Sequence, residues 1–261
     1  MENINLSIAK FYVEFSFCGL SMDNTISLLK FANLDSWQVS NDTSIRAFGK
    51  DTCCLVSPIM GYEELNQLLL VLDILKKENA FINKTCYIHV HVYENDFSFD
   101  DCIKLCNLTI PKEALILKAL NVNEKRTNIL DRSFIDKINT YKLIESMDDF
   151  KKAWYEYIGK EDTSKNCVDF HDFFNGKGIS INYFNGSLDY SDFLAYIDFS
   201  VGLVQKAHNE KCKPWTRHND SNEARQFVDF LWGMGIRGKN PRFKPTRAIL
   251  TRYLDGNAWK K

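Results

Sequence analysis

The stretch AKFYVEFSFCGL, residues 9–20, decides the class of fold. Aromatic and β-branched residues alternate with polar ones along it, which is the pattern of a β-strand with one apolar and one polar face. We therefore predict that this stretch is a strand of a sheet.

Further strands and helices are predicted from the same periodicities. The predicted strands lie at 37–39, 44–48, 53–58, 86–94 and 178–184, the first two as a hairpin around Asn41–Thr43. The predicted helices lie at about 23–32, 62–80, 98–106, 111–120, 133–144, 147–158, 190–208, 221–234 and 244–254. Strands joined by long helices, without regular βαβ alternation, indicate an α+β fold with a largely antiparallel sheet. Because no segment resembles a linker or a repeat, we expect one domain over residues 1–261.

Composition narrows the class of protein. Of the 261 residues 45% are hydrophobic, and the net charge of -1 is no reason to expect nucleic acid or an anionic membrane as partner. No apolar run approaches the roughly 18 residues of a membrane span. Charged residues interrupt the opening MENINLSIAKFYVEF, so we expect neither a membrane anchor nor a secretory signal. Eight scattered cysteines favour reduced thiols in the cytoplasm over a disulfide framework.

Two predicted strands carry polar side chains at alternate positions. In CYIHVHVYE, His89 and His91 lie on one face, because side-chain direction repeats every two residues. In GISINYFNGSL, residues 178–188, Ser180 and Asn182 form a face that is polar but uncharged. The histidines are either metal ligands or two inert imidazoles on a sheet face.

Seven stretches, in this order, resemble the phage- and plasmid-associated amidoligase family. They are FYVEFSFCGL, WQVSNDTSI, LVSPIMGYEEL, INKTCYIHVHV, LKALNVNEKR, HDFFNGKGISINYFNGSL and the terminal WGMGIRGK…RAILTRYLDGNAWKK. The resemblance implies a glutamine-synthetase-like fold, with a curved, mainly antiparallel sheet covered by helices that cups ATP, a divalent metal and a carboxylate substrate. It also implies activation of the carboxylate as an acyl phosphate and coupling to an amine, with Mg²⁺ or Mn²⁺ neutralising the phosphates.

The chain departs from the family pattern at several charged positions. Ser16 replaces the second of two acids on the first strand, and Cys54 replaces the acid before the Ser-Pro turn. Ser180 and Asn182 replace a glutamate and an arginine, and Asp169 replaces an asparagine. The family residues that remain are Glu14, Asp42, His89, His91 and Arg126. Each lost electrostatic stabiliser typically costs about 100-fold or more in rate, so the pattern favours lost catalysis.

Three hypotheses follow. The preferred one is a catalytically degenerate amidoligase-fold protein of phage or mobile-element origin that binds a macromolecule and modulates a host system. In that case we expect Asp42, Asp169, Ser180 and Asn182 to line a binding site, although Asn-Asp-Thr is also ordinary turn chemistry. The first alternative is an active ATP-dependent carboxylate–amine ligase in which Glu14 and Arg126 are catalytic.

The second alternative is a zinc protein on the same scaffold. Its ligands would be Glu14, Cys54, His89 and His91, because thiolate, imidazole and carboxylate suit Zn²⁺ better than Mg²⁺. Cys102 and Cys106, one helical turn apart, are expected to be half-buried thiols without a metal.

The end of the chain, about 211–261, is predicted to be helical and basic. From residue 236 on, the sequence has one acidic residue, Asp255, and eight basic ones. The basic residues are Arg237, Lys239, Arg242, Lys244, Arg247, Arg252, Lys260 and Lys261. This segment is either a solvated helix face or a surface that docks a protein or nucleoprotein partner.

Overall fold

The computed structural model describes residues 4–122, 130, 132–140, 144–158, 166–210, 222–237 and 239–254. In this part of the chain six strands form one sheet, in the order β2-β3-β1-β4-β6-β5. The strands are β1 (Lys10–Cys18), β2 (Gln38–Asn41), β3 (Thr52–Val56), β4 (Tyr87–Tyr93), β5 (Val168–Asp169) and β6 (Ile179–Asn185). Every neighbouring pair is antiparallel, so the predicted α+β class with an antiparallel sheet is confirmed.

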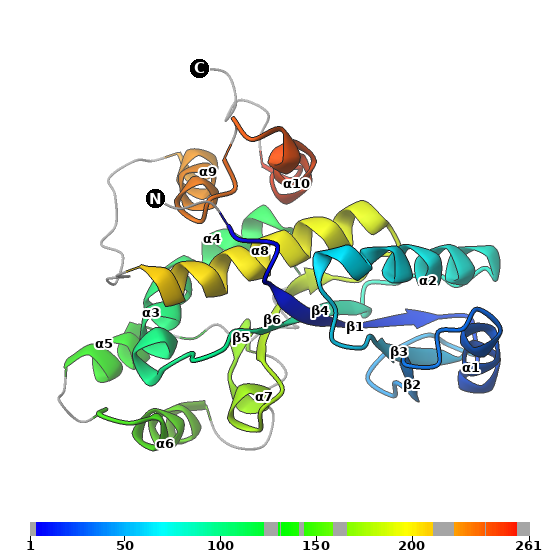
Figure 1. Cartoon of the computed structure of the whole chain (residues 1–261), viewed down its shortest axis with the longest axis horizontal. Coiled ribbons are helices and arrows are strands. Elements are labelled where there is room, and N and C mark those ends of the chain that lie inside the picture. The colour runs from blue at the N-terminus through cyan, green and yellow to red at the C-terminus, as the bar shows by residue number, and fades with distance from the viewer. Residues whose placement is uncertain are drawn as a thin grey trace.

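Helices lie on both sides of the sheet (Figure 1). They are α1 (Met22–Phe31), α2 (Leu65–Lys77), α3 (Phe99–Thr109), α4 (Glu113–Ala119), α5 (Arg132–Thr140), α6 (Met147–Ile158), α7 (His171–Phe174), α8 (Tyr190–Asn209), α9 (Glu223–Gly233) and α10 (Lys244–Leu250). Figure 1 shows α2 and α8 along one face of the sheet, with α6 and α7 on the other side. None of the helices described is long and apolar enough to cross a membrane.

The core lies between the sheet and the helix layer of α2 and α8. Phe11, Val13, Phe15 and Phe17 alternate along β1 and are fully buried on this side. Helix α8 packs against β4 and β6 and against α2, α3 and α10. Burial of about 25 cal/mol per Å² of apolar surface makes this layer the main source of stability.

Buried carboxylates of α8 hold α10 and the residues after it. Asp198 of α8 accepts hydrogen bonds from the Tyr62 hydroxyl at 2.8 Å and from the Thr246 hydroxyl at 2.6 Å. One turn and a half earlier, Asp192 pairs with Arg252 at 2.6 Å. Because a buried carboxylate needs such partners, these contacts set where α10 lies on α8.

The predicted hairpin of 37–39 with 44–48 is wrong in its second strand. Strand β2 pairs with β3, with Ser40 opposite Cys54. The Asp42 carboxylate accepts the backbone N–H of Ser44 at 2.9 Å and thereby starts a turn, and the chain returns to the sheet only at Thr52. The short β5 was not predicted, because two residues carry no periodicity.

Candidate functional site

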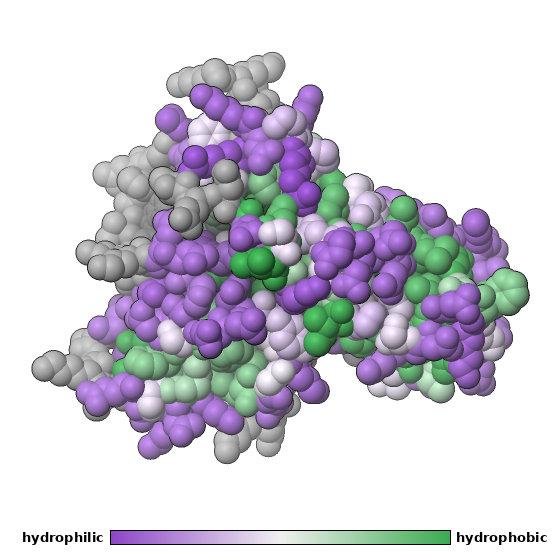
Figure 2. Space-filling model, in the orientation of Figure 1, coloured by the Kyte–Doolittle hydropathy of each residue, from purple (hydrophilic) through white to green (hydrophobic). Residues whose placement is uncertain are grey.

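The sheet face opposite the core carries the polar side chains of the central strands. On β1 these are Tyr12, Glu14 and Ser16, at every second position. The pairing register places Glu14 opposite His89 and Tyr12 opposite His91 of β4. Figure 2 shows the surface indented on this side of the sheet, between the part that holds α6 and α7 and the part that holds β2 and β3.

Glu14, His89 and His91 form the centre of the site. One ligand atom from each, a carboxylate oxygen or an imidazole nitrogen, lies within 4.8 Å of the other two. The His91 side chain is 3% exposed, whereas Glu14 is 28% exposed and reaches the solvent. Two imidazoles and a carboxylate are a common ligand set for Zn²⁺ and other divalent transition metals.

Aromatic rings hold both imidazoles in place. Tyr12 stacks on His91 with ring centroids 4.0 Å apart and planes 8° apart, and Tyr87 stacks on His89 at 4.4 Å. The Tyr87 hydroxyl also donates to Glu14 Oε1 at 3.1 Å. The three side chains of the cluster are therefore orientated before any ligand binds.

Glu14 is a carboxylate at neutral pH. Burial raises its pKa, but the His91 imidazole, the charges of His89 and His91 and the Tyr87 hydroxyl outweigh burial and lower the pKa to about 2. A ligand that must be deprotonated to bind a metal is thus already ionised.

Asp172 is a further acid of the site, which sequence reasoning missed. It lies in the four-residue helix α7, and its Oδ2 is 3.5 Å from His91 Nδ1. The other ring nitrogen, Nε2, is 3.7 Å from Glu14 Oε2. The Asp172 carboxylate pairs with His91 only when the imidazole is protonated, because His91 Nδ1 has no hydrogen-bond partner among the described residues. The available signal was the polar start of HDFFNGKG, directly after a buried strand.

Cys54 lies beside the cluster without belonging to the group of three. Its thiol is 3.5 Å from Glu14 Oε1 and 3.7 Å from the Tyr87 hydroxyl. Burial, and then the charge of Glu14, raise the pKa of the Cys54 thiol. The thiol is therefore a hydrogen-bond donor to Glu14 at neutral pH, and its role as a metal ligand stays a prediction.

At the positions where the family has charged residues, the neutral side chains of this chain make hydrogen bonds within the protein. Ser180 donates to Asn182 Oδ1 at 2.6 Å, and the Asn182 amide donates to the carbonyl of Asn166 at 3.0 Å. Ser16 accepts the backbone N–H of Tyr87 at 3.0 Å. Ser16, Ser180 and Asn182 are all at most 7% exposed, so their polar atoms bond within the protein rather than to the solvent. The Ser180 hydroxyl also lies 3.5 Å from His91 Nε2.

The remaining predicted residues lie at or beyond the rim. Asp169 of β5 is opposite Ser180 and accepts the backbone N–H of His171 at 2.9 Å. Asp42 accepts the Ser44 hydroxyl, and it lies two residues beyond Ser40, which is opposite Cys54, so strand alternation places it on the same side of the sheet. Arg126 lies outside the described residues.

Part of the positive charge of the C-terminal segment is paired within the fold. Arg242 lies 3.5 Å from Asp198 and 5.0 Å from the Tyr62 ring centroid, and Arg252 pairs with Asp192. Lys239 and Lys244 are exposed, and Arg237 and Arg247 are half-buried. Docking of a partner on this segment stays a prediction.

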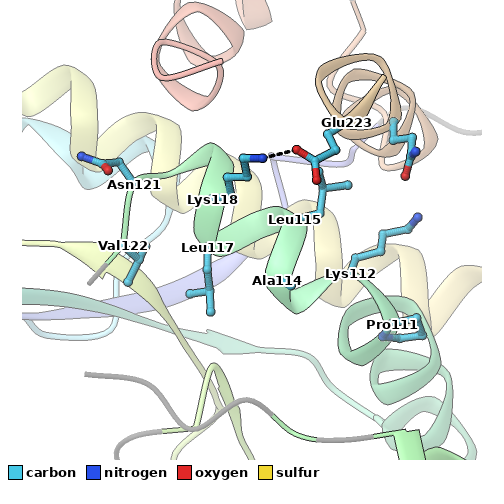
Figure 3. Close-up of a pocket in the computed structure, with 10 residues that line it drawn as sticks. Pro111, Lys112, Ala114, Leu115, Leu117, Lys118, Asn121, Val122 and Glu223 are labelled. Atoms are coloured by element: carbon cyan, nitrogen blue, oxygen red, sulfur yellow. Dashed lines mark hydrogen bonds and ion pairs between the residues drawn. The ribbon is translucent and has the colours of Figure 1, made fainter. Parts of the chain in front are cut away.

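Two cavities lie away from the polar face. One, of about 610 Å³, lies between α4 and α9, where Lys118 and Glu223 pair across it (Figure 3). The other, of about 480 Å³, lies beside the end of α8. Neither is lined by the Glu14 cluster, so the chemistry of the side chains, rather than cavity size, identifies the candidate site.

The fold and the candidate site together define the class of protein. This is an α+β protein with an acid–histidine cluster, suited to a divalent metal, on the open face of an antiparallel sheet. The family model described as "Putative amidoligase enzyme" matches residues 21–204, well over half of the chain, and the chain belongs to that family. The match includes His89, His91 and Asp172 and begins after Glu14. No curated protein matches the chain.

Proposed function

We propose that the chain binds a divalent transition metal through Glu14, His89 and His91, and that it is an amidoligase-family protein without ligase activity that works by binding. The observation that carries this proposal is the contrast within one sheet face. The acid–histidine cluster is complete, whereas the neighbouring positions hold neutral side chains that hydrogen-bond to one another or to the backbone.

The donor set supports the metal. Glu14 is ionised, both imidazoles are held by stacked tyrosines, and Asp172 lies behind His91. Zn²⁺ and Mn²⁺ fit two imidazoles and one carboxylate better than Mg²⁺, which prefers oxygen ligands.

The loss of ligase chemistry is supported by the buried neutral residues. A triphosphate and a transferring phosphoryl group need cations and metal-binding acids close by. Ser16, Cys54, Ser180 and Asn182 supply none of these charges, and each of them already makes a hydrogen bond within the protein. The phage or mobile-element origin that the resemblance implies stays a prediction, and so does a macromolecular partner.

The alternative is an active ATP-dependent carboxylate–amine ligase. Asp172 and Asp42 favour it, because these two acids lie on the same side of the sheet as Glu14 and add carboxylate oxygens. In that case Glu14, His89, His91 and Asp172 would hold Mg²⁺ or Mn²⁺, which would supply the positive charge that a triphosphate needs.

Thermal unfolding with Zn²⁺, Mn²⁺ and Mg·ATP tests both functions. We expect Zn²⁺ or Mn²⁺ to stabilise the wild type by about 2.7 kcal/mol at 100 times the dissociation constant. The Glu14→Gln variant should lose this effect, and the exposed Glu78→Gln should keep it. Equal stabilisation of all three proteins would overturn the metal site.

The effect of Mg·ATP on thermal unfolding distinguishes a binding protein from an active ligase. Under the proposal, millimolar Mg·ATP leaves the unfolding temperature of the wild type unchanged. A rise that depends on Mg²⁺ and disappears in Glu14→Gln would instead support the ligase, and release of phosphate on addition of carboxylate and amine mixtures would establish it.

A further inference from the structure

Two buried thiols face each other at the end of the sheet. Cys18 ends β1, Cys86 directly precedes β4, and their sulfur atoms are 3.7 Å apart. Both residues are 0% exposed and form a small apolar cluster with Ile45. A disulfide bond is about 2.05 Å long, so the two sulfurs must approach by roughly 1.6 Å.

The backbone around both cysteines is held in position. Cys18 exchanges hydrogen bonds with the backbone of Phe81, and the N–H of Cys86 donates to the carbonyl of Asn83. Gly186 packs directly on Cys86, where a β-carbon would come within 2.6 Å of the Cys86 β-carbon. The approach of the sulfurs is therefore expected to come from side-chain rotation rather than from strand movement.

One asparagine contacts both sulfurs. The Asn83 side-chain amide donates to Cys18 Sγ at 3.4 Å, and the Asn83 backbone N–H donates to Cys86 Sγ at 3.5 Å. The same amide donates to the carbonyl of Arg46 at 3.1 Å, which ties the loop after β2 to this corner. Among the described cysteines, Cys18 and Cys86 are the pair whose sulfurs are in contact.

We propose that Cys18 and Cys86 are an oxidation site that forms an intramolecular disulfide when the protein meets a peroxide. One thiol, as thiolate, attacks a peroxide oxygen, which gives a sulfenic acid and releases hydroxide that takes up a proton to form water. The second thiol then attacks the sulfenic sulfur, the S–S bond forms, and a second water leaves. The two thiols lose two electrons and two protons, and hydrogen peroxide is reduced to two waters.

The reaction is slow at neutral pH. Burial, and then the neighbouring Cys86, raise the pKa of the Cys18 thiol, and only the thiolate attacks peroxide readily. The rate of oxidation should therefore increase as the pH rises above neutrality. Such behaviour separates this pair from catalytic thiols, which oxidise rapidly at neutral pH.

The disulfide would act on the candidate site through Tyr87. This residue follows Cys86, donates to Glu14 Oε1 and stacks on His89. We expect the oxidised protein to bind Zn²⁺ with a changed affinity. That consequence rests on the proposed function, whereas formation of the disulfide does not.

Peptide mapping of peroxide-treated protein under non-reducing conditions is the test. Cys86 and Cys102 lie in one tryptic peptide, residues 85–104, so a second cleavage after Tyr87 is needed to separate them. We expect a linked pair that contains Cys18 and Cys86, has lost two hydrogens and disappears on reduction. Recovery of both cysteines as thiols, as sulfinic acids or in bonds to other cysteines would overturn the proposal.

Variants give an independent readout. Oxidation of the wild type should raise the unfolding temperature reversibly, because the bond closes a long loop and restricts the unfolded chain. Cys18→Ala and Cys86→Ala should each abolish this rise, and the control Cys167→Ala, which removes another buried thiol, should keep it. The same oxidative rise in Cys18→Ala or Cys86→Ala would assign the effect to other residues and overturn the proposal.

Discussion

Glu113 should make the stability of the protein depend on pH. It is the first residue of α4, is 0% exposed, and accepts the backbone N–H of Leu130 at 2.8 Å through Oε2. Its Oε1 has no hydrogen-bond partner among the described residues. Burial raises the pKa of Glu113 to about 8, against a lesser lowering by the Leu130 hydrogen bond. The folded protein therefore keeps a proton that the unfolded chain has already released.

The sign and size of the effect follow from this difference. A raised carboxyl pKa contributes stability that is complete below pH 4.5 and is lost as the pH rises through about 8. The difference of one bound proton corresponds to about 1.36 kcal/mol per pH unit. Between pH 5 and pH 7 the free energy of unfolding should thus fall by about 2.5 kcal/mol because of Glu113 alone.

The Glu113→Gln variant removes this titration and keeps a carbonyl oxygen for Leu130. Urea unfolding at pH 5, 6 and 7 should show the difference in unfolding free energy, wild type minus variant, falling by about 2.5 kcal/mol over this range. Glu78→Gln, at an exposed position, is the control and should follow the wild type. Parallel pH profiles of wild type and Glu113→Gln would refute the reasoning, because they would mean that Glu113 is ionised within the fold.

Three other changes test the buried polar groups. Burial lowers the pKa of Lys112 to about 7, so Lys112→Met should be more stable than the wild type at pH 7 when measured by urea unfolding. The difference in unfolding free energy between the two proteins should narrow toward pH 10.5, where the lysine of the unfolded chain also loses its proton. Thr246→Val removes a donor to Asp198 and should cost about 1–3 kcal/mol in chemical denaturation; an unchanged midpoint would contradict this. Ser16→Ala leaves the N–H of Tyr87 without its acceptor, and we expect a similar loss, measured by thermal unfolding.

Much of the fold could be predicted from local patterns. The strands around 9–20, 86–94 and 178–184 and the long helix at 190–208 are present close to the predicted bounds. These segments are long, and one face of each is buried, so their periodicity is strong. The pairing of β2 with β3 could not be predicted, because a turn at Asp42 and the return at Thr52 depend on contacts that are distant in sequence.

The site divides in the same way. That His89 and His91 share a face follows from the period of a strand, and this part of the prediction needs no tertiary information. That Glu14 lies beside them requires β1 and β4 to be neighbours in one register, which is a non-local property. Asp172 could not be placed from the sequence, because a helix of four residues has no periodicity and its reach to His91 depends on how β5 and β6 pair.

The sequence by itself determined the class of fold, the family and the side chains available for chemistry, since these follow from local periodicity and residue type. Only the tertiary structure decided which of these side chains meet. It placed the ligand atoms of Glu14, His89 and His91 within 4.8 Å of one another, and it joined Ser180 to Asn182 by a hydrogen bond. It also brought the sulfurs of Cys18 and Cys86 into contact. The physical reason is that sheet register and helix packing are set by the burial of the whole core, to which residues far apart in the chain contribute together.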